Sequence, residues 1–249
     1  MRHLLLHQHS PYSEISVYET DELYGERGRF RVLQFASEAV QGAMDMDRPE
    51  RVILEYPRAM LHLLQHRVSE RDRVFIIGQG TGTLASRLTG VRVTVAEIDP
   101  LVAEISSTYF GYQGAPVKIG DGRRLLEEEP PGAFSGIIVD AFSERGTPAH
   151  LTSLEFFQLA AERLDREGLL LLNVFGRGAD DVWIAALAAT MQAVMSDVRV
   201  FSLPADQPHD LRNMIVAGSF KPIGYQAQGM AGFVESQPGR GYLIRDKSS

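Results

Sequence analysis

Three glycines that follow a short β-branched run constrain the chain more than any other feature. Val74–Ile77 is apolar, as expected of a buried parallel strand, and three glycines come next: Gly78, Gly80 and Gly82. A helix-compatible segment and a second β-branched strand, Val91–Ala96, lead to Glu97. This order is the layout of a nucleotide-binding βαβ unit, in which glycines let a ligand approach the backbone and the acid accepts hydrogen bonds from ribose hydroxyls.

The spacing of the glycines indicates which nucleotide the turn suits. A dinucleotide fingerprint reads G-x-G-x-x-G, whereas this chain reads G-x-G-x-G and has Thr83 at the position of the last fingerprint glycine. A phosphate-binding P-loop is excluded because the turn has no lysine. The spacing, together with Glu97, resembles the S-adenosylmethionine-type fold. The competing interpretation is a glycine turn in an ordinary α/β domain.

Further apolar segments predict the rest of an α/β domain. Five more strands are expected: Val117–Ile119, Ile137–Val139, Gly168–Val174, Val198–Ser202 and Met214–Ser219. Helices are expected over Tyr56–Gln65, from Pro100 onward, and over Leu154–Leu164 and Ala179–Met195. The sequence therefore predicts a Rossmann-like, seven-stranded, mostly parallel sheet with helices on both faces and an antiparallel edge. No prediction is made for the tail after Lys221.

Acidic residues follow three successive strands of this predicted sheet. Glu97 ends the second strand, Asp121 and Gly122 follow the third, and Asp140 follows the fourth. Ligands of open α/β sheets bind beyond the carboxyl ends of the strands, so these acids are expected to gather at one site. Asp121 taken alone is equally typical of a simple Asp-Gly turn.

Residues 1–48 are predicted to form a small N-terminal β-sheet module ahead of a Rossmann-like domain over residues 49–249. Glu14–Tyr18 and Arg29–Phe35 are β-rich, and turn-prone charged residues separate them. Arg48 and Pro49 provide a plausible boundary. The module is therefore expected to be antiparallel.

Three histidines in this module have the even spacing of one strand face: His3, His7 and His9. Such a row can bind a metal. No carboxylate or cysteine accompanies them in the segment, so an ordinary surface strand is the preferred interpretation.

Composition limits the classes of function. The 249 residues are 44% apolar, which is enough for one large domain, and the net charge of −7 argues mildly against a nucleic-acid partner and for a cationic substrate. The absence of cysteine excludes disulfides and thiolate chemistry. No apolar run approaches the length of a membrane helix and the N-terminus lacks a signal-peptide layout, so a soluble cytoplasmic protein without a membrane partner is expected.

Several short motifs occur in a fixed order between Ser10 and Ser219. They are SPYSEISVYE with Tyr12, the segment ending Ala39-Val40-Gln41, Tyr56 before the first helix of the main domain, and then IGQGTG, AEID, GDGR and IIVDAF. This ordered set resembles the spermidine synthase family, the aminopropyltransferases. The wording DAF…PAHL…F is most similar to the spermidine synthase-like branch of that family.

The resemblance implies a reaction. Family members bind decarboxylated S-adenosylmethionine and move its aminopropyl group to an amine such as putrescine, which leaves methylthioadenosine. Only a neutral amine is nucleophilic, and free alkylamines are mostly protonated near neutral pH, so a carboxylate must hold the ammonium and take its proton. By this resemblance Asp140 is the expected base, and Tyr56 helps to position the amine.

The other expected roles rest on the same resemblance. Glu97 would bind the ribose, and Asp121 with Gly122 would bind the adenine. The glycine turn is expected on the sulfonium side of the cofactor: Gly78, Gly80, Thr81 and Gly82. Three residues are expected on the substrate side: Tyr12, Gln41 and Ser143. No metal is required, and a homodimer is expected because family members are usually dimers or larger.

Four positions depart from the family pattern. Thr81 stands where the family keeps an aspartate that meets the aminopropyl ammonium and repels the carboxylate of ordinary S-adenosylmethionine. Ser143 replaces the second aspartate of a D-x-x-D pattern, Ser13 replaces a glutamine, and Arg58 replaces an acid. The cofactor side is thus retained, whereas the acids that recognise the amine are fewer.

Two alternatives remain open. A methyltransferase that uses ordinary S-adenosylmethionine is favoured by Thr81 and opposed by the N-terminal sheet and the Tyr56 segment. A nucleoside-binding homologue without turnover is favoured by Ser143 and Arg58 and opposed by Asp140 and Gln41.

Overall fold

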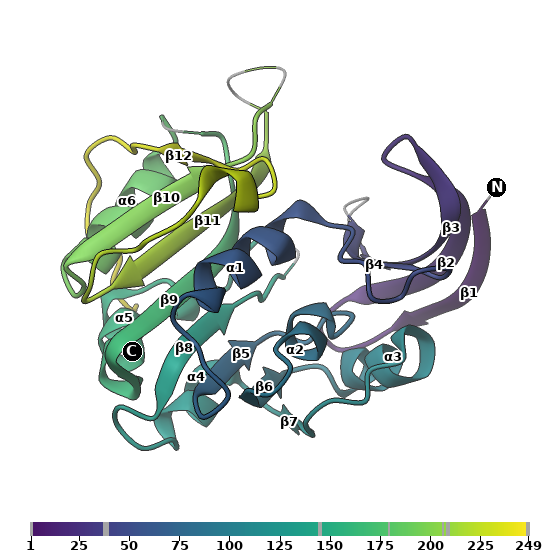
Figure 1. Ribbon diagram of the computed structural model, residues 1–249, viewed down its shortest axis with the longest axis horizontal. Helices are drawn as coiled ribbons and strands as arrows, with labels where there is room; N and C mark the ends of the chain where they lie inside the picture. The colour runs from purple at the N-terminus through teal and green to yellow at the C-terminus, as the bar shows by residue number, and fades with distance from the viewer. Residues whose placement is uncertain are drawn as a thin grey trace.

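Two β-sheets organise the chain in the computed structural model, which describes residues 2–36, 40–143, 146–178, 180–205, 207 and 210–247 (Figure 1). The N-terminal sheet is antiparallel in the order β1-β2-β3-β4. Its strands are β1 (Arg2–His9), β2 (Glu14–Leu23), β3 (Glu26–Phe35) and β4 (Val40–Asp45). The expected small antiparallel module is therefore present. Ala39, in the predicted glutamine segment, lies outside the described residues.

The second sheet has the strand order β12-β10-β11-β9-β8-β5-β6-β7. Its strands are β5 (Arg73–Ile77), β6 (Arg92–Glu97), β7 (Val117–Ile119), β8 (Phe134–Val139), β9 (Leu164–Gly176), β10 (Asp197–Ser202), β11 (Arg212–Ser219) and β12 (Val234–Ser236). Strands β5 to β9 pair in parallel, and β9, β11, β10 and β12 pair antiparallel. Seven of these strands are the predicted ones, so the α/β Rossmann-like fold is confirmed.

The eighth strand is the one departure from the predicted sheet. β12 is only three residues long and its side chains are mostly exposed, so it has no apolar pattern that a sequence analysis detects. It pairs with β10 from Val200 opposite Ser236 to Ser202 opposite Val234. Phe233, just before β12, is buried and fixes the tail against the sheet.

Helices cover both faces of the large sheet. They are α1 (Glu55–Gln65), α2 (Thr83–Arg87), α3 (Pro100–Phe110), α4 (Gly122–Glu127), α5 (Leu154–Arg163) and α6 (Val182–Gln192). The predicted start of α6 at Ala179 lies outside the described residues. Its first turn begins at Val182 because Asp181 caps it, accepting hydrogen bonds from the Trp183 and Ile184 N–H groups.

Alternating side chains of the central strands divide the core into two layers. Phe75 and Ile77 pack with α4, α5 and α6, whereas Val74 and Ile76 pack with α1. A separate apolar cluster, which includes Ile15 from β2 and residues of α3, joins the N-terminal sheet to the main domain. Figure 1 shows this sheet beside α3, near the end of the large sheet where β5 runs into α2. None of the helices in the described ranges has the length and apolar character needed to cross a membrane.

Candidate functional site

The three glycines of the turn after β5 have different surroundings. A Cβ at Gly78, where φ is 102°, would lie 2.1 Å from the carbonyl oxygen of Asp140, so this glycine allows β5 and β8 to end in contact. A Cβ at Gly82 would lie 2.6 Å from the Tyr112 ring. Gly80, at φ 50°, has nothing within 4 Å of such a Cβ. Close packing thus requires glycine at positions 78 and 82, whereas the backbone at Gly80 is open, and the approach of a ligand to the turn stays a prediction.

Glu97 ties this turn to the end of β6. Its Oε2 accepts a hydrogen bond from the Gln79 backbone N–H at 2.8 Å, and its Oε1 accepts one from the Asp99 N–H at 2.9 Å. Burial raises the pKa of the Glu97 carboxyl, while these backbone donors act in the opposite direction. The carboxylate is consequently fixed by groups that cannot turn away.

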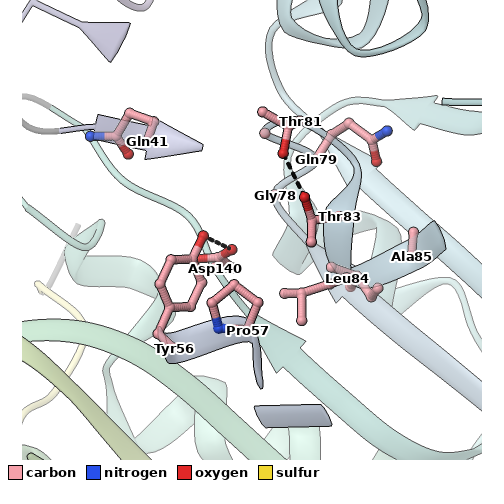
Figure 2. Close-up of a pocket in the computed structure, with 12 residues that line it drawn as sticks. Gln41, Tyr56, Pro57, Gly78, Gln79, Thr81, Thr83, Leu84, Ala85 and Asp140 are labelled. Carbon is pink, nitrogen blue, oxygen red and sulfur yellow. Dashed lines mark hydrogen bonds between the residues drawn. The ribbon is translucent and has the colours of Figure 1, made fainter. Parts of the chain in front are cut away.

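A cavity of about 320 Å³ opens at the carboxyl ends of β5, β6 and β8. Most of the residues predicted from the sequence line it: Tyr12, Gln41, Tyr56, Gly78, Gly80, Glu97, Asp121, Gly122, Asp140 and Ser143. Thr81 instead lines a small neighbouring pocket of about 20 Å³, and Gly82 lines neither (Figure 2). The acids of three successive strand ends therefore share one cavity, as the sequence predicted. We call it the main cavity.

Asp140 lies at the inner wall of the main cavity and accepts hydrogen bonds on both carboxylate oxygens. The Tyr56 hydroxyl donates to Oδ2 at 3.0 Å (Figure 2), and the Asn173 side-chain amide donates to Oδ1 at 2.9 Å. Burial raises the pKa of the Asp140 carboxyl to about 6, and the two donors limit that rise. Burial and the neighbouring Asp140 charge raise the pKa of the Tyr56 hydroxyl well above its ordinary value. A carboxylate in this state can accept a proton near neutral pH.

Asn173 and Asn213 are two site residues that the sequence analysis missed. Asn213 on β11 donates to the Asn173 Oδ1 at 3.0 Å, so a chain of amides extends from the Asp140 carboxylate across β9 to β11. Asn173 is almost fully buried within the otherwise apolar run LLLLNV. A buried amide needs partners, and a single asparagine in such a run is the signal that would have found it.

Asp121 already has a partner on each carboxylate oxygen. Its Oδ1 caps α4 by accepting a hydrogen bond from the Arg124 N–H at 3.0 Å, and its Oδ2 lies 2.8 Å from the His150 Nε2. His150 also lines the main cavity, and nothing in the sequence patterning singled it out. An adenine amino group at Asp121 therefore has to share the carboxylate with the imidazole or displace it.

Two of the positions that depart from the family pattern have local structural roles. Thr81 Oγ1 lies 2.8 Å from Thr83 Oγ1, and the Thr81 methyl packs so closely on Gly42 of β4 that a Cβ there would be 2.4 Å away. Ser143 donates through its hydroxyl to the Gly146 carbonyl at 2.9 Å and closes a turn. Both side chains are thus engaged by the protein itself.

A second cavity of about 190 Å³ lies on the other side of Tyr56. Three residues line both this cavity and the main one: Gln41, Tyr56 and Phe142. Its remaining wall includes Glu55, the one carboxylate among its lining residues, together with two aromatic rings, Tyr24 and Phe175. Asn173 and Asn213 complete the wall near Asp140. We call it the side cavity.

Comparisons with known proteins agree with this architecture. The family model described as "Spermine/spermidine synthase domain" matches residues 54–204. A polyamine aminopropyltransferase from Vibrio vulnificus is 28% identical over 212 residues, which are 80% of this chain and 67% of that protein. For several plant spermidine synthases the aligned segment spans less than half of the relative's own length.

Solved structures resemble the whole described fold. A probable spermidine synthase from Corynebacterium glutamicum superposes with a TM-score of 0.81 at 20% identity, covering 98% of this chain and 96% of that chain. A spermidine synthase in complex with the transition-state analogue AdoDATO superposes with a TM-score of 0.67 at 18% identity, covering 92% and 83%. At these identities the likeness establishes the fold alone.

Proposed function

Because the chain belongs to the spermine/spermidine synthase family, we propose that it transfers the aminopropyl group of decarboxylated S-adenosylmethionine to an amine such as putrescine, a step of polyamine biosynthesis. The observation that carries this proposal is the buried Asp140 carboxylate in the wall of the main cavity, with a pKa raised to about 6 and with two donors, Tyr56 and Asn173, that also line the side cavity. A base in this position can meet a nucleoside in the main cavity and an amine that arrives from the side cavity past these donors.

In this proposal the main cavity holds the nucleoside. Glu97 accepts the ribose hydroxyls, Asp121 with Gly122 contacts the adenine, and Gly80 lets the sulfonium side approach the turn. The structurally similar spermidine synthase was solved with the transition-state analogue AdoDATO bound, which supports the assignment of the cofactor. Thr81, which lines the small pocket beside Gly80, is proposed to face the end of the cofactor where the decarboxylated and ordinary forms differ, and Gly82 shapes the turn.

The side cavity is proposed to receive the acceptor amine. Gln41 and Tyr56 stand in the wall that it shares with the main cavity, so an amine that enters here reaches Asp140 past the Tyr56 hydroxyl. Tyr24 and Phe175 offer ring faces to a cationic chain, and Glu55 offers a carboxylate to its far end. Tyr12 and Ser143, which line the main cavity, are proposed to cover the reacting groups.

The chemistry balances with Asp140 as the only proton acceptor. The ammonium gives a proton to the carboxylate, and the neutral nitrogen attacks the carbon next to the sulfonium. The new N–C bond forms as the C–S bond breaks. The electron pair of the C–S bond goes to sulfur, which leaves methylthioadenosine. A carboxyl with a pKa near 6 is a stronger base than an ordinary aspartate, so burial of Asp140 favours the proton transfer.

The products distinguish the candidate functions. Purified protein is incubated with decarboxylated S-adenosylmethionine and, separately, with the ordinary cofactor, each with a panel of diamines and monoamines, and mass spectrometry identifies the nucleoside. Methylthioadenosine formed only in the presence of an amine supports aminopropyl transfer. S-adenosylhomocysteine supports a methyltransferase, which Thr81 favours. Nucleoside binding without turnover of any amine supports the non-catalytic homologue.

Assembly, location and the division of the chain belong to this proposal as well. A homodimer is predicted from the resemblance, and light scattering at micromolar concentration tests it, because a monomer across that range would contradict it. The division into a β module over 1–48 and a catalytic domain over 49–249 is supported by the gap between the end of β4 at Asp45 and the start of α1 at Glu55. Cytoplasmic location and a reaction without metal also stay predictions.

A further inference from the structure

The N-terminal sheet brings two histidines and a carboxylate together on its edge strand. His7 and His9 are exposed on β1, and Glu14 at the start of β2 pairs in register with His9. One ligand atom of each side chain lies within 4.8 Å of the others. The carboxylate that these histidines lack in their own segment is therefore supplied by the neighbouring strand.

We infer that His7, His9 and Glu14 form a binding site for a divalent transition metal of the zinc class, apart from the proposed reaction. Two imidazoles and one carboxylate are a ligand set that zinc accepts. The His7 Nε2 lies 3.3 Å from the Glu14 Oε1. Tetrahedral zinc with bonds of about 2.0–2.1 Å separates two ligand atoms by about 3.3 Å, so this pair already has the required spacing.

The orientation of His7 also suits a metal ligand. Its Nδ1 lies 3.0 Å from the Ser16 hydroxyl, and its other ring nitrogen, Nε2, points to Glu14. A hydrogen bond at one ring nitrogen holds an imidazole in place and leaves the other nitrogen available to the ion, as around known metal sites. The His9 ring stands edge-on to the His7 ring with centroids 5.5 Å apart, and one of its nitrogens already lies within 4.8 Å of the ligand atoms of His7 and Glu14.

The site lies at the base of a hairpin that reaches the main cavity. The turn between β1 and β2 is closed by the hydrogen bond from the Ser10 N–H to the Ser13 carbonyl, and Tyr12 and Ser13 line the cavity. A metal held by His7, His9 and Glu14 would link the two strands just below this turn. Binding to the folded chain alone also raises its stability by mass action.

Calorimetric titration of the tag-free protein with ZnCl₂ tests the site. We expect one ion per chain, a higher melting temperature with zinc, and loss of both effects in His9→Ala and in Glu14→Ala. His3→Ala is the matched control, because His3 is an exposed histidine of the same strand outside the cluster, and its zinc binding should be unchanged. Ser16→Ala should weaken binding by about 10-fold, the usual cost of losing an outer partner of a ligand.

Cobalt provides a second measurement that does not depend on stability. The protein with Co²⁺ in place of zinc should show the visible absorption of a tetrahedral cobalt site, and this absorption should disappear in His7→Ala, while circular dichroism confirms that the variant is folded. Equal zinc affinity in the wild type, His9→Ala and His3→Ala would mean adventitious binding only and would overturn the inference. An ordinary His7–Glu14 ion pair would likewise give no specific cobalt spectrum.

Discussion

The proposed nucleoside side and the proposed amine side of the site hold their acids in different ways. On the nucleoside side, Glu97 is fixed by two backbone N–H groups of the glycine turn and the following loop. On the amine side, Asp140 is held by two neutral side chains, Tyr56 from α1 and Asn173 from β9. Burial raises the pKa of both carboxyls, to about 6 for Asp140.

This difference separates binding from reaction. Backbone donors keep the Glu97 carboxylate in one place, which suits a group that positions a ribose. Side-chain donors can shift when an ammonium arrives, and they leave Asp140 with a pKa close to the working range of a base. The comparison teaches that Glu97 is held by rigid backbone donors and Asp140 by side-chain donors, which fits the proposed roles of a fixed binding group and a base.

We expect the largest effect from Asp140→Asn, which should lower turnover without weakening nucleoside binding. The substitution keeps the shape and removes the proton acceptor, so turnover should fall by about 10²–10⁴-fold. Nucleoside affinity should change little, because Asp140 is not among the groups assigned to ribose and adenine. Steady-state product formation and calorimetry with the nucleoside measure the two quantities. Normal turnover in this variant would contradict the proposed mechanism.

Glu97→Gln is the complementary change on the nucleoside side. Hydrogen bonds to a charged group contribute about 1.5–3 kcal/mol, so nucleoside affinity should fall by roughly 10- to 100-fold, with turnover at saturation affected less. Glutamine has one carbonyl oxygen, so either the Gln79 or the Asp99 N–H also loses its acceptor. A thermal melt of each variant serves as the control for this cost. An unchanged affinity would remove Glu97 from the binding side.

The pH dependence sharpens the comparison further. With Asp140 as base, turnover should decline as the pH falls through about 6, because protonation of the carboxyl removes the proton acceptor. Asn173→Ala deletes a donor that favours the charged carboxylate, so the acid limb should move to higher pH by about one unit, corresponding to roughly 1.4 kcal/mol. Val198→Ala, on β10, is a control outside the site. An acid limb that does not move would mean that Asn173 does not tune Asp140.

The raised pKa of Asp140 also affects the stability of the fold. High pH favours the base in the reaction, whereas low pH favours the folded state. Because the folded pKa of Asp140 lies above the ordinary 3.8, this group favours the folded state most below about pH 4. That contribution is lost as the pH rises through 6. Taken alone, it lowers the unfolding free energy at pH 7 by about 3 kcal/mol, since one pKa unit is about 1.4 kcal/mol. Asp140→Asn should recover part of that difference at pH 7, measured by urea unfolding.

The residues of the proposed nucleoside side follow from local sequence signals, whereas the roles of Asp140 and Tyr56 on the proposed amine side came from the family resemblance, and Asn173 was missed. Glu97 and Asp121 follow the glycine turn within one stretch, and strand, turn and acid are local signals. Asp140 depends on Tyr56, 84 residues earlier, and on Asn173, 33 residues later, so only the folded sheet brings them together. Asn213 lies farther along still, on a strand whose pairing with β9 no local pattern reveals.

Three misses have the same physical origin. His150 meets Asp121 only because η1 (Ala149–Leu151) folds back over the cavity, and Glu14 meets the histidines only through strand pairing. The edge strand β12 is too short to leave an apolar pattern. Each depends on contacts between segments, whereas the strand and helix positions followed from periodicity within a segment.

We expect the smallest effect from Thr81→Asp, which tests how the glycine turn distinguishes decarboxylated from ordinary S-adenosylmethionine. An aspartate at this position should disfavour the carboxylate of ordinary S-adenosylmethionine by about 1–2 kcal/mol, since the pair is partly solvated and the effective dielectric is well above the dry-interior limit. The affinity for decarboxylated S-adenosylmethionine should fall less. Thr81→Asn is the matched control, because it has nearly the same shape without the charge, and it must fit the same space against Gly42. Calorimetry with both nucleosides on the three proteins gives the ratio of affinities. If the ratio of affinities is the same in Thr81→Asp and Thr81→Asn, position 81 does not face the end of the cofactor where the two nucleosides differ. Thr81 would then have a purely structural role in the glycine turn.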